Sequence, residues 1–173
     1  MADTQDLLTV GEVAECVERL GREIAAVIDD DTVVAVLLTG GLWFAADLTR
    51  ALYRQGCSPL FDAIWLGSYG DAKTSSGAIA VLAGPQRPVA GRRVLLLDDV
   101  LDTGASLIHA RDLMLAAGAV EVLTAVFAAK PWPTPRAIAP DFVGWQAPAR
   151  FLAGYGMDVA GRERGRPGVA ALD

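Results

Sequence analysis

The sequence of 173 residues is poor in the residues that build disulfide or metal frameworks, with two cysteines and one histidine. Cys16 and Cys57 lie far apart without a spacing typical of metal ligands, which argues against a disulfide framework and against a zinc site. The single histidine, His109, has no second ligand residue near it in the chain. We therefore expect His109 to be a surface or packed side chain.

Long apolar runs and an excess of positive charge are also absent. The longest strongly apolar run, Val33–Leu38, is too short to span a bilayer. Residues 2–6 lack the basic and then apolar pattern of a signal peptide. With 15 basic and 21 acidic residues the net charge is -6, which disfavours binding to phosphate backbones. These features predict a cytoplasmic protein whose partners are neither membranes nor nucleic acids.

The residues that are present provide a sizeable core, because 53% are hydrophobic and 21% are charged. This length predicts a single domain spanning residues 1–173. Four prolines between Lys130 and residue 141 exclude regular helix or central strand there. We therefore expect a core of about residues 1–130 and a small C-terminal hood of about residues 131–173.

Strand and helix patterns alternate along the predicted core. Thr9 and Glu12 form a capping-box pattern before an amphipathic helix. Helical stripes also follow Gly41 and precede Gly118. The strands are expected at residues 32–38, 61–66, 79–82, 94–97 and 120–129. This alternation predicts an α/β fold with a mainly parallel, twisted sheet flanked by helices.

The segment that follows the strand at 94–97 carries the strongest chemical signal. It begins with Asp98 and Asp99 and continues with Asp102, Thr103, Gly104, Ala105 and Ser106. Ligands of parallel sheets bind at the carboxyl ends of strands. Small residues and the amides that open a helix suit a phosphate monoester, whereas carboxylates suit sugar hydroxyls, directly or through a divalent cation. The segment therefore predicts a sugar-phosphate site.

A simple helix cap at Asp102 or Thr103 explains one of these residues but not three aspartates. The segment resembles the 5-phosphoribosyl 1-pyrophosphate (PRPP) motif of type I phosphoribosyltransferases. The resemblance implies that Asp98 and Asp99 hold the ribose hydroxyls and Mg²⁺, and that residues 103–106 bind the 5′-phosphate. It also implies that Asp102 is the general base at N7 of a purine.

Later segments resemble the hypoxanthine-guanine branch of that family. They are Lys130–Pro131, residues 141–145 and residues 151–158. The resemblance implies that Lys130 donates to the 6-oxo group, Phe151 stacks on the base and main-chain groups of Leu152 meet its edge. It assigns Asp158 to a second magnesium and Arg164 to pyrophosphate. A lysine has donors and no acceptor, so it favours a 6-oxopurine over adenine.

Two further segments match loops of the family. Ser68 and Tyr69 resemble the Ser-Tyr pair of its flexible loop, whose closure shields the reaction from water. Thr39 and Gly40, followed by Gly41, occupy the place of the pyrophosphate-binding loop, where many members have lysine instead of Thr39.

The resemblance implies purine salvage, in which a 6-oxopurine and PRPP give a nucleoside 5′-monophosphate and pyrophosphate. It also implies Mg²⁺ as cofactor and a homo-oligomer, either a dimer or a tetramer. Val159, the stretch 160–163 and Ala105 depart from the family pattern, so the preference among hypoxanthine, guanine and xanthine stays open. The alternatives are a phosphoribosyltransferase for another base, such as xanthine or a pyrimidine, and a non-catalytic regulator that senses PRPP or a nucleotide.

Overall fold

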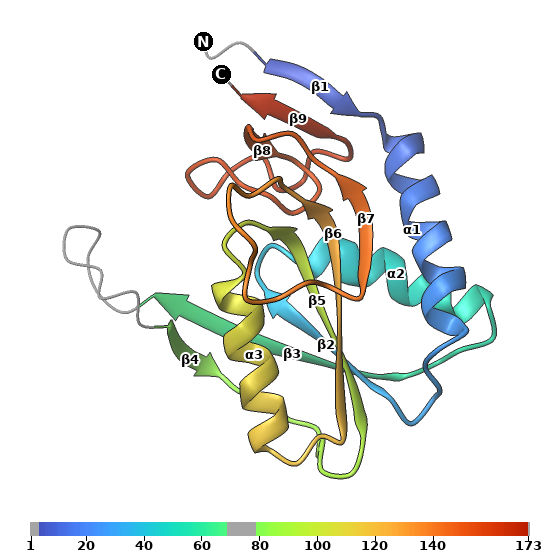
Figure 1. The fold of residues 1–173 in the computed structure, drawn as a ribbon. Coiled ribbons are helices and arrows are strands. Elements are labelled where there is room, and N and C mark those ends of the chain that lie inside the picture. The colour runs from blue at the N-terminus through green and yellow to red at the C-terminus, as the bar shows by residue number, and fades with distance from the viewer. Residues whose placement is uncertain (1–3, 69–78, 173) are drawn as a thin grey trace.

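The computed structural model describes residues 4–68 and 79–172, which form a larger six-stranded sheet with helices on both faces and a smaller three-stranded sheet (Figure 1). In chain order the elements are β1 (Thr4–Leu8), α1 (Val10–Ala25), β2 (Val33–Leu38), α2 (Leu42–Arg54), β3 (Leu60–Ser68), β4 (Ile79–Ala83), β5 (Arg93–Leu101), α3 (Ala105–Ala116), β6 (Glu121–Ala129), β7 (Phe142–Gln146), β8 (Phe151–Ala153) and β9 (Val169–Leu172).

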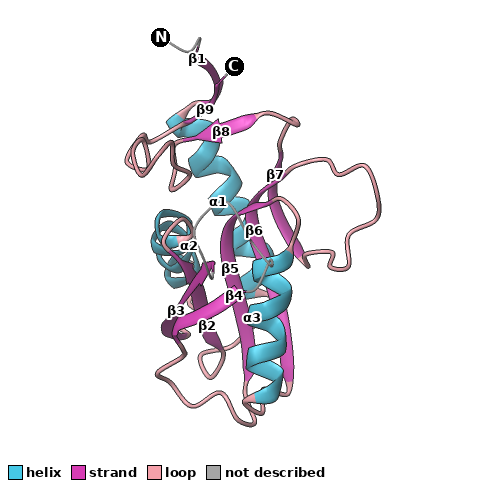
Figure 2. Ribbon diagram, turned by 90° about the vertical axis from the view of Figure 1, so that its left-hand side faces the viewer, coloured by secondary structure: helices cyan, strands magenta, loops and turns pink. Residues whose placement is uncertain are grey.

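The larger sheet has the strand order β4-β3-β2-β5-β6-β7. All neighbouring strands in it are parallel except the antiparallel edge strand β4. The sequence of β2 is apolar throughout because helices cover both faces of the sheet. Helices α1 and α2 lie on one face and α3 on the other (Figure 2). The predicted α/β class with a mainly parallel sheet is confirmed.

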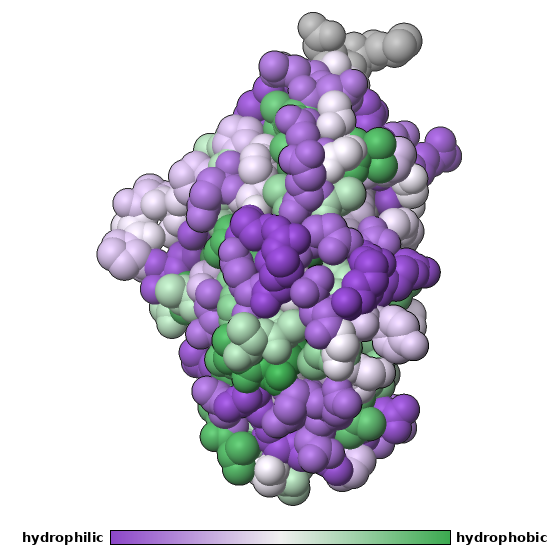
Figure 3. Space-filling view, turned by 90° about the vertical axis from the view of Figure 1, so that its right-hand side faces the viewer, coloured by the Kyte–Doolittle hydropathy of each residue, from purple (hydrophilic) through white to green (hydrophobic). Residues whose placement is uncertain are grey.

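Helix α1 begins at the capping box that the sequence predicts. The Glu12 amide donates to Thr9 Oγ1 at 3.3 Å, and the Thr9 amide donates to Glu12 Oε2 at 2.8 Å. Four apolar side chains on the inner face of the helix are buried: Val13, Val17, Leu20 and Ile24. The side of the molecule that bears α1 is mostly hydrophilic, with smaller hydrophobic areas (Figure 3).

Strand β5 is longer than the sequence predicts. The expected polar turn from residue 98 begins only after Leu101, because β6 continues alongside and pairs with Asp98, Val100 and Leu101. The polar side chains of Asp98 and Asp99 predict a turn, whereas pairing with β6 at Asp98, Val100 and Leu101 continues the strand through both residues. The two aspartates therefore lie on a rigid strand and not on a loop.

The two sheets do not separate at residue 130, where the sequence predicts the boundary between core and hood. Strand β7 belongs to the larger sheet, where it pairs with β6, and the small sheet has the order β1-β9-β8. The N-terminal strand thus joins the C-terminal strands, and the two ends of the described chain lie side by side (Figure 1). Residues 131–140 contain no helix or strand, as their prolines predict. The hood therefore comprises β8, β9 and residues 154–168 between them, and not the whole of residues 131–173.

The two cysteines and the single histidine lie at separate places in the fold. Both cysteines are free thiols, with Cys57 buried and Cys16 partly exposed. His109 lies half-buried on α3. No helix within residues 4–68 and 79–172 is long and apolar enough to cross a membrane.

Candidate active site

Three of the predicted site segments follow the carboxyl ends of neighbouring strands of the larger sheet. Strands β2, β5 and β6 are parallel neighbours, so their carboxyl ends lie side by side. The loop at Thr39–Gly41 follows β2, the loop at residues 102–104 follows β5, and Lys130 follows β6. Segments far apart in the sequence are thereby brought to one place.

Asp98 and Asp99 form an acidic pair near the end of β5. The Asp99 amide donates to Asp98 Oδ1 at 3.0 Å, and the Val100 amide donates to Asp99 Oδ1 at 2.8 Å. Burial raises the pKa of Asp98 well above its usual range, and the neighbouring charge of Asp99 raises it further. Burial also raises the pKa of Asp99, although hydrogen bonds from the Asp98 side chain and the Val100 amide, and then the charge of Arg164, oppose this. Such a pair favours a partner that brings hydroxyl donors or positive charge.

The donor chemistry of this pair fits a hard cation such as Mg²⁺, which prefers oxygen ligands. Asp158 is turned to another partner, because its Oδ1 lies 2.7 Å from Arg164 Nη2 and its Oδ2 accepts from the Gly161 amide at 2.7 Å. In the part of the chain that the structure describes, no group of three His, Cys, Asp or Glu side chains converges on one point. A cation at Asp98 and Asp99 therefore needs further oxygen ligands from substrate and water.

Gly40 packs directly against the acidic pair. A Cβ at this position would lie 2.0 Å from Asp99 Oδ2, so a larger residue would displace the Asp99 carboxylate. On the hood side, a Cβ at Gly156 would lie 2.1 Å from the Gly40 carbonyl oxygen. The loop at Thr39–Gly41 is thus held between Asp99 and the hood, with Thr39 exposed and the peptide bond between Leu38 and Thr39 in the cis form.

The N-terminus of α3 is open to an anion. Gly104 is the N-cap residue at φ +86°, and as a glycine it provides no side-chain capping hydrogen bond. Thr103 Oγ1 accepts from the Ala105 amide at 3.2 Å, and Thr103, Ala105 and Ser106 are exposed. A cap at Thr103 therefore accounts for the Ala105 amide but not for the rest of this segment. The other amides at this helix N-terminus suit a phosphate group.

Asp102 and Lys130 face each other across the ends of β5 and β6. Lys130 Nζ lies 3.8 Å from Asp102 Oδ2, too far for a hydrogen bond but close enough for electrostatic attraction. The Asp102 side chain is 56% exposed and that of Lys130 is 18% exposed. The site thus presents a carboxylate and an ammonium group side by side.

The hood carries the residues expected at the base and at pyrophosphate. Phe151 on β8 is 54% exposed, while Leu152 beside it is buried. Arg164 Nη1 donates to the Gly156 carbonyl at 2.5 Å, which places the arginine against the turn that covers Gly40. Ser68 ends strand β3, and Tyr69 lies outside the described residues.

The atypical tail folds as a tight turn. Val159 and Arg162 exchange two main-chain hydrogen bonds of 3.0 Å. Ala160, Gly161 and Glu163 adopt positive φ angles around this turn. Arg164 follows this turn directly, so the atypical sequence is compatible with the hydrogen bond from Arg164 to the Gly156 carbonyl.

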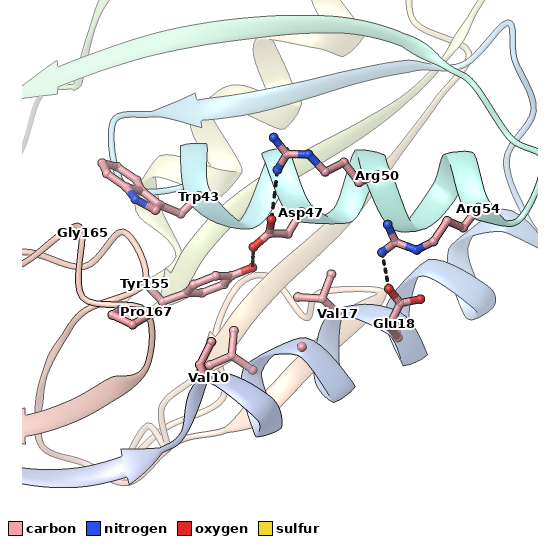
Figure 4. A pocket seen from close by; sticks show the side chains of 12 residues that line it. Val10, Val17, Glu18, Trp43, Asp47, Arg50, Arg54, Tyr155, Gly165 and Pro167 are labelled. Atoms are coloured by element: carbon pink, nitrogen blue, oxygen red, sulfur yellow. Dashed lines mark hydrogen bonds and ion pairs between the residues drawn. The ribbon is translucent and has the colours of Figure 1, made fainter.

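A link between the hood and α2 has no counterpart among the sequence predictions. The Tyr155 hydroxyl donates to Asp47 Oδ2 at 3.0 Å, and Arg50 pairs with Asp47 Oδ1 at 3.1 Å (Figure 4). Burial, with the charge of Asp47, raises the pKa of the Tyr155 phenol, which therefore stays protonated. These groups border a hollow of about 360 Å³ between α1, α2 and the hood. No local pattern predicts this contact, because its partners lie 108 residues apart.

The comparisons with known proteins agree with this geometry. A family model described as "Phosphoribosyl transferase domain" matches residues 10–160. The hypoxanthine-guanine phosphoribosyltransferase of Bacillus subtilis is 30% identical, over 96% of this chain and 91% of that protein. The enzyme of the same name from Aquifex aeolicus is 33% identical, over 96% and 93% respectively. The chain belongs to the phosphoribosyltransferase family.

Solved structures extend this assignment to the fold. A hypoxanthine phosphoribosyltransferase from Trypanosoma cruzi is similar to this phosphoribosyltransferase with a TM-score of 0.89 and 25% identity, over 99% of this chain and 96% of that one. A hypoxanthine phosphoribosyltransferase from Staphylococcus aureus matches with a TM-score of 0.88 at 23% identity, over 98% and 91%, which supports the fold alone. The predicted family, including its hypoxanthine-guanine branch, is confirmed.

Proposed function

We propose that this phosphoribosyltransferase converts a 6-oxopurine, hypoxanthine or guanine, and PRPP into a nucleoside 5′-monophosphate and pyrophosphate. The observation that carries the proposal is the pairing of Asp102 with Lys130 at 3.8 Å, beside the glycine-capped N-terminus of α3. This arrangement offers separate places for a purine edge and for a phosphate. The product of such a reaction serves purine salvage.

The base is recognised on one edge by two groups of opposite charge. In a 6-oxopurine, the oxygen at C6 and the nitrogen N7 are adjacent on the same edge. The Lys130 ammonium has only donors, so it binds the 6-oxo group and rejects the amino group of adenine. Asp102 accepts the proton that N7 gives up as the new glycosidic bond forms, which is general-base work. Phe151 stacks on the ring, and main-chain groups of Leu152 meet the edge of the base.

The ribose and phosphate groups of PRPP bind along β5 and α3. The amides and hydroxyls of residues 103–106 hold the 5′-phosphate at the start of the helix. Asp98 and Asp99 accept hydrogen bonds from the ribose hydroxyls, a role that suits two half-buried carboxylates near the carboxyl end of a strand. Their placement fixes the sugar before C1 loses its pyrophosphate.

Pyrophosphate leaves between the loop Thr39–Gly41 and Arg164. When bound, magnesium would supply positive charge that neutralises the leaving group. Asp98 and Asp99 would hold one ion together with oxygens of substrate and water, and Asp158, which pairs with Arg164 in this structure, would serve a second ion. Arg164 packs against the Gly156 turn that covers Gly40, so it can contact an anion placed between the hood and Gly40. Ser68 and Tyr69 are proposed to close over the site and exclude water.

Replacement of Asp102 with Asn tests this assignment. The amide keeps the size of the side chain but cannot take a proton, so we expect kcat with hypoxanthine to fall by about 10²-fold or more. Calorimetry should show that PRPP binds as in the wild type. Asp112→Asn on the exposed side of α3, where Asp112 pairs with Arg111, is the matched control and should leave kcat unchanged.

Two experimental results would contradict the proposal. Wild-type rates in Asp102→Asn would remove the assigned base. Tight PRPP binding by the wild-type protein without turnover of any base would instead favour a regulator that senses PRPP.

A further inference from the structure

Arg136 lies in the proline-rich segment of residues 131–140 and binds three main-chain carbonyls of the site. Its Nε donates to the Asp102 carbonyl at 2.6 Å. Its Nη2 donates to the Lys130 carbonyl at 2.6 Å and, more weakly, to the Leu101 carbonyl at 3.4 Å. One half-buried guanidinium thus joins the end of β5 to the end of β6.

The surroundings of Arg136 hold its side chain in this position. Its guanidinium carbon lies 5.5 Å from the centre of the Trp132 ring, within the range of a cation–π contact. Among the described residues, no carboxylate pairs with Arg136. Its positively charged guanidinium therefore interacts with the three carbonyl oxygens. Hydrogen bonds from a charged donor are shorter and stronger than neutral ones, and a planar guanidinium fixes their directions.

The gap between Asp102 and Lys130 makes this arrangement functionally important. At 3.8 Å these two groups do not hydrogen-bond to each other, so their own contact does not fix their spacing. The Asp102 carboxylate is exposed and follows directly after the last residue of β5. Arg136 instead fixes the main chain of both residues. Both side chains therefore remain available to a ligand.

We propose that Arg136 is a positioning residue that holds Asp102 and Lys130 at the spacing needed to contact one edge of the purine together. The inference rests on the proposed function and adds a residue that touches neither substrate. A displacement of about 1 Å in such groups costs up to about 10²-fold in rate. Arg136 thereby makes the proline-rich segment part of base selection.

A matched control is available on α1. Arg19 Nη2 donates to the carbonyls of Val143 and Gly144 at 3.1 Å and 2.6 Å, so it makes the same kind of contact away from the site. Arg19→Ala measures the general cost of removing an arginine from main-chain carbonyls. Thermal melting of both alanine variants shows whether each is folded.

The kinetic test compares Arg136→Ala, Arg136→Lys and Arg19→Ala. We expect Arg136→Ala to lower kcat/KM for hypoxanthine by at least about tenfold while KM for PRPP stays unchanged. Arg136→Lys should restore part of this loss, because an ammonium reaches some but not all of the carbonyls. Arg19→Ala should leave both parameters unchanged. Equal losses for hypoxanthine and PRPP in Arg136→Ala would overturn the inference.

A double variant separates positioning from folding. Once Asp102→Asn has removed the base, Arg136→Ala should lower the remaining rate much less than it does in the wild-type background. The same fold-loss in both backgrounds would mean that Arg136 acts only through overall stability.

A binding measurement keeps this test independent of turnover. Arg136→Ala should weaken the binding of inosine 5′-monophosphate by about tenfold and leave ribose 5-phosphate binding unchanged. If the wild-type protein shows no turnover, the proposed function fails, whereas this binding difference still decides the role of Arg136. Unchanged binding of inosine 5′-monophosphate would overturn it.

Discussion

Gly104 sets the direction of the chain where the phosphate site meets α3, and Gly104→Ala tests that geometry. The residue has a φ of +86°, and a Cβ there would lie 2.7 Å from Cγ2 of Ile138. Ile138 is buried in the core under α3, so its side chain has little room to move. Alanine therefore meets both a backbone and a packing penalty.

The two penalties can be estimated separately. The left-handed backbone conformation costs alanine about 1–2 kcal/mol relative to glycine. Overpacking against a buried side chain costs about 1–3 kcal/mol. A combined loss of about 3 kcal/mol lowers Tm by about 6–12 °C in a domain of this size.

Thermal melting with a matched glycine measures the packing part. Gly56 has a φ of +80°, and no atom of the described residues beyond its chain neighbours would lie within 4 Å of a Cβ there, so Gly56→Ala meets only the backbone penalty. In an Ile138→Leu background, where the Cγ2 methyl is absent, Gly104→Ala should cost about as much as Gly56→Ala. We also expect Gly104→Ala to weaken PRPP binding, because it redirects the amides that open α3.

Two results would refute this reasoning. Equal Tm losses for Gly104→Ala and Gly56→Ala in the wild-type background would mean that Ile138 does not constrain the turn. Unchanged PRPP binding in a folded Gly104→Ala variant would mean that the turn does not position the phosphate site.

Two further substitutions probe the charged groups of the site. Lys130→Ala should raise KM for hypoxanthine by at least about tenfold, the scale of a lost charged hydrogen bond, and leave KM for PRPP unchanged; equal losses would make Lys130 structural. The pKa of Asp98 in the folded protein is raised above its ordinary value of 3.8. As the pH rises from about 4 through this raised pKa, ionisation of Asp98 therefore destabilises the fold. Asp98→Asn should therefore raise Tm at pH 7 and lose this advantage below about pH 4; melts that differ equally at every pH would contradict this.

The local parts of this structure could be predicted from the sequence. The Thr9 capping box and the uniformly apolar β2 are set by neighbouring residues, so their patterns are visible without a structure. The acidic and small residues between Asp98 and Ser106 belong to one strand, turn and helix, and a resemblance identifies them as a PRPP motif. Parallel strand order then accounts for the approach of Lys130 to Asp102.

Contacts between distant segments could not be predicted in this way. The continuation of β5 through Asp98 depends on β6, and the pairing of β1 with β9 joins the two ends of the chain. Arg136 lies in a segment without regular structure, and its carbonyl partners carry no sequence signal because every residue has a carbonyl. These features arise from tertiary packing and require the structure.

Pyrophosphate release by the purified protein, measured with PRPP, magnesium and a panel of bases, tests the proposed reaction most directly. We expect release with hypoxanthine or guanine, matched by formation of the nucleoside 5′-monophosphate, and none with adenine. Xanthine completes the panel and defines the preference among oxopurines. Absence of release with every base, or release with adenine as fast as with hypoxanthine, would contradict the assignment of Lys130 and Asp102 to a 6-oxopurine.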